Sequence, residues 1–108
     1  MESGLDAIFH ALSDPTRRAI LRDIAGGERT VGAVAKPYPI SLAATSKHLK
    51  VLERANLIHR EKRGSYQIVR INPEPLRQAE EWLAFYEKFW NERLDVVQAI
   101  LEAEEEGE

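Results

Sequence analysis

Basic side chains gather in the middle of the chain, in a pattern suited to binding phosphate groups. Residues 41–72 contain seven Lys or Arg and two Asp or Glu, whereas residues 1–40 contain five of each. Residues 73–108 contain three basic and eleven acidic residues. The net charge of −3 therefore combines a positive middle segment with a negative final third. Because phosphate contacts need local positive charge, the middle segment is a candidate surface for nucleic acid.

The first half of this segment is predicted to be a helix. Ser41 is a typical N-cap, and no glycine or proline interrupts the run to Ala55. Ala55-Asn56 is expected to end the helix, because Asn tolerates the left-handed conformation found at helix ends. Thr45, Leu49 and Leu52 are spaced to face inward. The outward side then carries Ser46, Lys47, Lys50 and Arg54, after an exposed first turn that holds Leu42 and Ala43.

The second half reads as a β-hairpin with a basic tip. Residues 57–62 and 66–71 are short β-prone runs, and Arg63-Gly64-Ser65 joins them. Lys62 and Arg63 are therefore expected at the tip, within reach of a nucleic-acid backbone.

Three shorter helices are predicted ahead of this segment. The first has an apolar face that includes Leu5 and Phe9. The second follows an Asp14 cap with Pro15 at its first position and ends at Gly26-Gly27. The third is a short helix over residues 31–35, with Thr30 as its candidate cap.

From Glu74 to about Glu104 the sequence predicts one long helix with a broad apolar stripe. Such a helix is longer than a domain of this size can cover, so part of the stripe should pair with a second copy of the chain. The residues expected at that interface are Leu5, Phe9, Leu76, Trp82, Leu83, Phe89, Trp90 and Val97.

Taken in order, these elements predict a mainly α fold with a small β-hairpin wing, a winged helix-turn-helix. We expect one domain over residues 1–108, with a DNA-binding core at 12–72, a dimerisation helix at 73–104 and a frayed acidic tail at 105–108. The recognition helix would enter the major groove while the wing meets a neighbouring backbone. The expected DNA contacts are Ser41, Leu42, Ala43, Ser46, Lys47, His48, Lys50, Lys62 and Arg63.

Two segments resemble the ArsR family of winged-helix repressors: residues 12–21, LSDPTRRAIL, and residues 46–58, SKHLKVLERANLI. Within this family, the chain most resembles the subgroup whose C-terminal helix starts near NPEPL, here residues 72–76, and carries a Phe-Trp pair, here Phe89-Trp90. The resemblance implies a homodimeric repressor that binds inverted-repeat double-stranded DNA. It also favours a phosphate contact for His48.

The chain departs from the family pattern at the metal-sensing positions and in the recognition helix. Many members sense metals through cysteine pairs on the short helix before the recognition helix, or through His and Asp near the C-terminus. Here the corresponding short helix, residues 31–36, reads VGAVAK, and the long helix contains no histidine. We therefore expect no metal and no cofactor. Family members more often have other residue types at the positions of Thr45 and Leu42. The operator sequence of a relative therefore cannot be assigned to this chain.

Other function classes fit the residues less well. The chain has no cysteine, which excludes thiolate chemistry, and Glu80 and Glu81 are adjacent on a helix and so point apart. Neither His10 nor His59 has a neighbouring residue in the sequence that could act as a second metal ligand. With no recognisable catalytic arrangement in the sequence, we expect no enzyme. Residues 1–12 lack a signal-peptide pattern, and no stretch could span a membrane, so we expect a cytoplasmic protein.

Two alternatives to a simple repressor are open at this point. The first is a protein-interaction module that uses the winged helix without DNA, and its signature would be loss of the basic front. The second is the same DNA-binding regulator with an unidentified small-molecule effector bound between the long helices.

Overall fold

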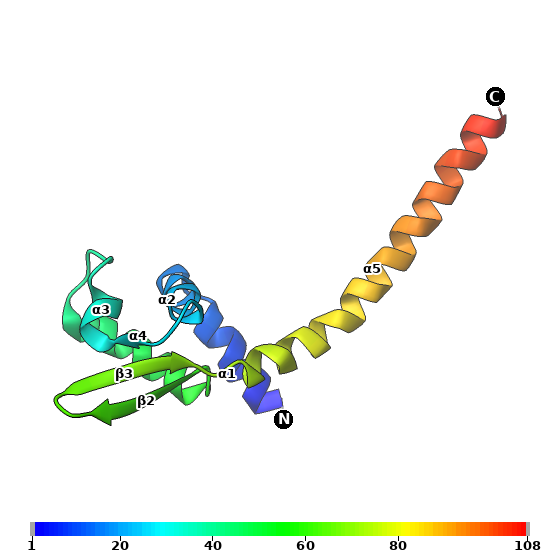
Figure 1. Ribbon diagram of the computed structural model, residues 1–108. Coiled ribbons are helices and arrows are strands. Elements are labelled where there is room, and N and C mark those ends of the chain that lie inside the picture. The colour runs from blue at the N-terminus through cyan, green and yellow to red at the C-terminus, as the bar shows by residue number, and fades with distance from the viewer. Residues whose placement is uncertain (1, 108) are drawn as a thin grey trace. The chain divides into compact units, whose positions relative to one another are not determined.

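A computed structural model describes residues 2–107, with side chains from residue 4 onward. The elements are, in chain order, α1 Glu2–Leu12, α2 Pro15–Ala25, β1 Arg29–Thr30, α3 Val31–Ala35, α4 Leu42–Arg54, β2 Ile58–Arg63, β3 Tyr66–Ile71 and α5 Glu74–Gly107 (Figure 1). This order confirms the predicted mainly α fold with a small β wing.

The chain divides into two compact units, and the boundary lies within α5. The first unit, residues 1–77, is called the headpiece here and holds α1 to α4, the three strands and the first turn of α5. The second, residues 78–108, is called the C-terminal unit and holds the rest of α5. Everything that the sequence assigns to DNA contact lies in the headpiece.

Side-chain caps fix where three headpiece helices begin. Asp14, Thr30 and Ser41 each accept a hydrogen bond from the backbone amide three residues later, at 3.0, 3.1 and 3.0 Å. Each cap satisfies one of the free amides at the start of α2, α3 or α4. Pro15 follows Asp14 at the first turn of α2, where its missing N–H costs nothing. All three caps match the sequence prediction.

The strands form an antiparallel sheet in the order β1-β3-β2. Within this sheet β2 extends to Arg63, which pairs with Tyr66, so the connecting turn is the two residues Gly64 and Ser65. The sequence predicted a three-residue tip that included Arg63. Gly64 adopts a φ of 60°, which the first central position of such a tight turn favours. The two-residue strand β1 was not predicted, because two residues carry no periodic signal.

The headpiece core lies between α2, α4 and the sheet. Ile20 and Ile24 from α2, Leu49 and Leu52 from α4, and Val69 from β3 are all almost fully buried. Thr45 on α4 is buried as well, and its hydroxyl donates to the Ser41 carbonyl at 3.2 Å. Because the inward face of α4 is held by this core, its opposite face is free to meet a partner.

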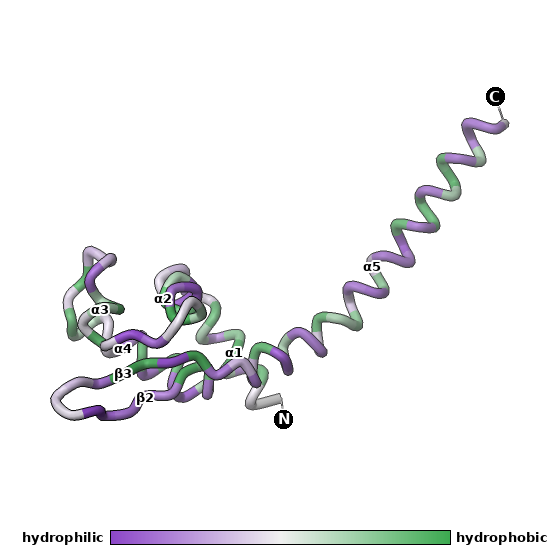
Figure 2. The backbone as a smooth tube through the Cα atoms, viewed as in Figure 1, coloured by the Kyte–Doolittle hydropathy of each residue, from purple (hydrophilic) through white to green (hydrophobic). Residues whose placement is uncertain are grey.

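In α5, apolar and polar positions alternate turn by turn along the helix (Figure 2). The helix continues through residues 105–107, where the sequence suggested a frayed tail; Glu108 lies outside the described residues. Ala103, Glu104, Glu105 and Glu106 are good helix formers, and just before them Gln98 donates to Glu102 across one turn at 3.1 Å. None of the described helices, α5 included, is long and apolar enough to span a membrane.

Candidate nucleic-acid interface

The N-terminal turn of α4 is open and lined by small or slim side chains. Ser41, Leu42 and Ala43 are exposed, and Leu42 keeps 59% of its surface. An exposed leucine at a helix N-terminus gains nothing in a monomer, but its narrow side chain suits close approach to a groove floor. The Ser41 Oγ accepts from the Ala44 amide and keeps its own hydroxyl proton for a partner.

Cationic side chains continue this face along α4. Lys47, Lys50 and Arg54 are exposed, while Ser46 is half-buried. For Lys47 and Lys50 no hydrogen bond or ion pair is recorded with any residue of the described part of the chain. Their ammonium groups are therefore available to phosphate oxygens on either wall of a groove.

His48 lies on another side of the helix and faces α2. Its Nδ1 is 3.4 Å from the Arg17 guanidinium and 4.0 Å from an Asp14 carboxylate oxygen. Its side chain is 23% exposed. The sequence interpretation gave this residue a phosphate contact, which stays a prediction. What the structure adds is an intramolecular contact that joins α4 to the start of α2.

Asp14 and Arg17 are each held by further contacts around His48. The pKa of Asp14 lies below its usual value, first because the carboxylate accepts the Arg17 amide and then because of positive charge on His48 and Arg17. The Arg17 guanidinium donates to the carbonyls of Ala11 at 2.7 Å and His10 at 2.9 Å. These are terminal carbonyls of α1, where a cation is favoured. Arg17 therefore locks α1, α2 and α4 together.

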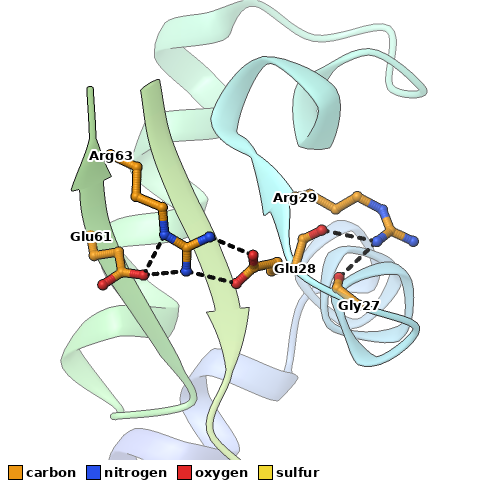
Figure 3. A network of polar contacts seen from close by, with 5 residues as sticks. All are labelled: Gly27, Glu28, Arg29, Glu61 and Arg63. Carbon is orange, nitrogen blue, oxygen red and sulfur yellow. Dashed lines mark hydrogen bonds and ion pairs between the residues drawn. The ribbon is translucent and has the colours of Figure 1, made fainter. Parts of the chain in front are cut away.

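On the wing, Arg63 is engaged by two carboxylates from different parts of the headpiece (Figure 3). Its Nη1 and Nη2 donate to the two oxygens of Glu28 at 2.6 and 3.1 Å. Its Nε donates to Glu61 at 2.9 Å, and Nη2 forms a second hydrogen bond to the same oxygen. Pairing with Arg63 lowers the pKa of Glu28, while both carboxylates raise the pKa of Arg63. The wing tip thus carries a paired cation.

Other basic wing residues differ in how they are held. Arg60 donates to Gln67 at 3.0 Å and lies 4.0 Å from Glu53 of α4. Lys62 is exposed, and no hydrogen bond or ion pair is recorded for it among the described residues. Of the two cations that the sequence places at the tip, Arg63 is therefore paired with carboxylates, whereas Lys62 has no such partner among the described residues. Glu28 was missed because it lies 35 residues from Arg63 and no local pattern links them.

The predicted dimerisation residues fall into two groups. Leu5 and Phe9 on α1 are half-buried, and Leu76 packs against the headpiece core of its own chain. The members in the C-terminal unit are exposed, among them Trp90 at 62%. The exposed set comprises Trp82, Leu83, Phe89, Trp90 and Val97 from the prediction, together with Phe85, Tyr86, Leu94, Val96, Ile100 and Leu101.

Within the C-terminal unit, Arg93 is a cation that contacts one of these apolar side chains. Its guanidinium stacks over the Phe89 ring at 4.9 Å. The two side chains line a shallow hollow with Glu92 and Val96. The prediction of a small-molecule effector between the long helices is not tested by this surface, and it stays a prediction.

Metal binding finds no support in the side-chain arrangement. Across the described residues, no three His, Asp or Glu side chains gather closely enough to hold an ion. His10 and His59 are both exposed. Across the described residues, each buried side-chain nitrogen or oxygen has a hydrogen-bond partner, so no unpaired side-chain donor or acceptor marks a cofactor site.

Similar proteins identify the family. Residues 12–61 match the family described as helix-turn-helix domain. The chain is 34% identical over 79 residues to the transcriptional repressor SdpR of Bacillus subtilis, covering 73% of this chain and 88% of that protein. The crystal structure of the ArsR family transcriptional regulator RHA00566 has a TM-score of 0.78 at 37% identity, covering 84% of this chain and 94% of that one. The chain belongs to the ArsR family of winged helix-turn-helix transcriptional regulators.

Family membership confirms the fold class and the DNA-binding function that the sequence predicted. As an ArsR regulator the chain is a DNA-binding transcriptional regulator and not an enzyme. The matched residues run from the end of α1 through α4 into β2, so they include both α3 and α4. Another similar structure is the homodimeric winged helix-turn-helix DNA-binding domain of Mb0332 from Mycobacterium bovis. Its TM-score is 0.65 at 25% identity, covering 80% of this chain and 81% of that one.

Proposed function

We propose that this ArsR regulator is a homodimeric repressor that binds an inverted-repeat operator, with one α4 in each half-site. The observation that carries the proposal is the open face of α4, where a capped, slim N-terminal turn leads into Lys47 and Lys50. A recognition helix needs both features, because the turn must enter the groove while the cations reach its walls. The repressor role follows the name of SdpR.

Lys62 and Arg63 are proposed as the wing contacts to a neighbouring backbone. Ser41, Leu42, Ala43 and Ser46 are proposed to face the base edges, with Lys47, His48 and Lys50 on the flanking phosphates. The alternative of a protein-interaction module predicts that this basic front is lost, and the exposed lysines of α4 argue against it.

Dimerisation is proposed through the apolar face of the C-terminal unit, with help from Leu5 and Phe9 of α1. The eleven large apolar side chains exposed on α5 form more apolar surface than a soluble monomer commonly leaves open. The homodimeric state of Mb0332 supports two-fold pairing. A two-fold dimer presents two recognition helices to a palindrome about one helical turn apart. Because a DNA-binding transcriptional regulator must reach the DNA that it controls, a cytoplasmic location is also part of the proposal.

Binding to duplexes at several salt concentrations tests this proposal. The probe is a duplex from the promoter upstream of the protein's own gene, beside a random-sequence duplex of equal length. We expect tighter binding to the promoter, two chains per duplex, and an affinity that falls steeply with salt, since each phosphate contact contributes a slope of about −0.9. Equal affinity for the two duplexes, or one chain per promoter site, would contradict the proposal.

A further inference from the structure

Arg63 stands at the hairpin tip by its backbone, yet its guanidinium does not. The residue ends β2 beside the Gly64-Ser65 turn. Its side chain runs back from the turn and lies over β3, between Glu61 on β2 and Glu28 just ahead of β1 (Figure 3). All three guanidinium nitrogens donate to these two carboxylates. The group that the sequence offers to DNA is therefore turned toward the body of the headpiece.

The three side chains together carry a net charge of −1 where the sequence suggests a positive tip. A carboxylate and a phosphate can replace each other as partners of a guanidinium, because both accept its N–H groups in the same bidentate geometry. The side chains of Arg63 and Glu28 are 49% and 43% exposed, so water screens their attraction and an incoming phosphate can reach the pair.

We propose that Glu28, assisted by Glu61, is a specificity-determining residue that competes with the DNA backbone for Arg63. In the free protein the two carboxylates pair with the Arg63 guanidinium and keep it from a DNA phosphate. This pairing weakens binding to random-sequence DNA, which depends on phosphate contacts alone. Once α4 occupies its groove, the wing is held against the backbone and Arg63 exchanges its carboxylates for a phosphate. This inference rests on the wing contact proposed above.

A purely structural role for the same contacts makes the opposite prediction. If Arg63 only straps β2 to the segment before β1, then loss of Glu28 loosens the wing and weakens DNA binding. If Glu28 competes with phosphate, its loss frees Arg63 and strengthens binding. The sign of the change therefore separates competition from strapping.

The experiment is a double-mutant cycle with Glu28→Gln, Arg63→Gln and the combined variant, on a random-sequence duplex at several salt concentrations. A random duplex reports phosphate contacts and needs no knowledge of the operator. Glu28→Gln should bind about two- to fivefold tighter, the range expected for an exposed ion pair. Arg63→Gln should bind no tighter than wild type, and in its background Glu28→Gln should bring at most a small gain.

The control is Asp6→Asn, which removes an exposed carboxylate of α1 that pairs with no wing cation. It measures how much the loss of one negative charge strengthens binding by itself. A Glu28→Gln gain that equals the Asp6→Asn gain, or that persists undiminished without Arg63, overturns the proposal in favour of long-range charge. Weaker binding by a Glu28→Gln variant that is still folded at the assay temperature overturns it in favour of the strap.

A second measurement follows the guanidinium itself by nuclear magnetic resonance. The Nε–H signal of Arg63, assigned by its loss in Arg63→Gln, should move in Glu28→Gln and also when the promoter duplex is added to wild type. A signal that DNA leaves in place overturns the exchange. Failure of the proposed repressor function would instead appear as equal affinity for promoter and random duplexes, whatever the Glu28 variants do.

Discussion

The headpiece and the C-terminal unit are both rich in apolar side chains but use them in opposite ways. In the headpiece, the apolar faces of α2, α4 and the sheet close on one another, and side chains such as Leu49 and Ile20 are fully buried. In the C-terminal unit, the large apolar side chains of α5 remain exposed, Trp90 at 62% among them. The headpiece therefore buries its apolar core within one chain, whereas the large apolar side chains of the C-terminal unit are left uncovered by their own chain.

This contrast separates two kinds of stability. Burial inside the headpiece contributes to folding at any protein concentration, because it needs no second molecule. Burial of the α5 face contributes only when two chains meet, so its effect depends on protein concentration. Mutations in the two regions should therefore be distinguishable by dilution alone.

The largest expected effect is loss of the dimer in Trp90→Glu. The substitution removes the largest exposed apolar side chain of the face and places a charge among Phe89, Leu94 and Val97. We expect dimerisation to weaken by about 3–5 kcal/mol, the range for loss of a buried tryptophan. Operator affinity should fall with it, since a single headpiece loses the second half-site.

Sedimentation at micromolar concentration measures this effect. Asn91→Glu is the matched control, because it adds the same charge to the neighbouring position, which is exposed and polar. The control should remain a dimer. A Trp90→Glu variant that sediments as a dimer, or a wild type that sediments as a monomer, would show that the α5 face is not the interface.

The next effect in size is the loss of core packing in Leu49→Ala. Leu49 is fully buried between α4 and the rest of the headpiece, so truncation should lower the free energy of unfolding by about 2–5 kcal/mol. Denaturant unfolding at two protein concentrations checks it. The loss attributable to Leu49 should be the same at both concentrations, and Lys50→Ala, one residue along and exposed, should cause little change. If the loss of unfolding free energy in Leu49→Ala disappeared on dilution, the stability of the headpiece would depend on protein concentration in the same way as burial of the α5 face.

Smaller losses are expected on the DNA-facing side of α4. Lys47→Ala and Lys50→Ala should each weaken operator binding by about 1–3 kcal/mol without altering the melting curve, because both side chains are exposed and make no contact that supports the fold. Each should also make the slope of log affinity against log salt concentration less steep by about 0.9, the contribution of one phosphate contact. Arg22→Ala, an exposed cation on α2, serves as the control in the same gel-shift series. Equal affinities for all three variants would mean that another surface reads the DNA.

The smallest effect concerns the cap of α2. Asp14→Ala should lower the free energy of unfolding by about 1 kcal/mol, because the Arg17 amide loses its acceptor. The pKa of Asp14 is depressed in the folded protein, so the carboxylate stabilises the fold above its usual pKa of 3.8. This contribution is lost as the pH falls through the depressed folded pKa.

Urea unfolding at neutral and strongly acidic pH measures the cap. The stability gap between wild type and Asp14→Ala should narrow in acid, and Asp6→Ala, an exposed carboxylate on α1 that caps no helix, should open no such gap. A gap that is constant with pH would mean that the Asp14 side chain stabilises α2 by packing and not by its charge.

Local features of the fold follow from the sequence by itself. The three caps, the ends of α2 and α4 and the existence of the hairpin all depend on residues within four positions of one another, and each was predicted. Asn56, with a φ of 59°, ends α4 at the position its residue type suggested. The exposed apolar stripe of α5 is likewise a property of one helix, so its periodicity alone revealed it.

Only the tertiary structure decided what the long-range partners are. Arg63 finds Glu28 across 35 residues, and His48 finds Arg17 across 31, because the packing of α2, α4 and the sheet brings those chain segments together. Leu76 carries the same apolar signal as Leu83, yet it packs against the headpiece core while Leu83 stays exposed. Sequence spacing says which face of a helix is apolar, but burial is decided by what lies opposite that face, and the fold alone supplies that neighbour.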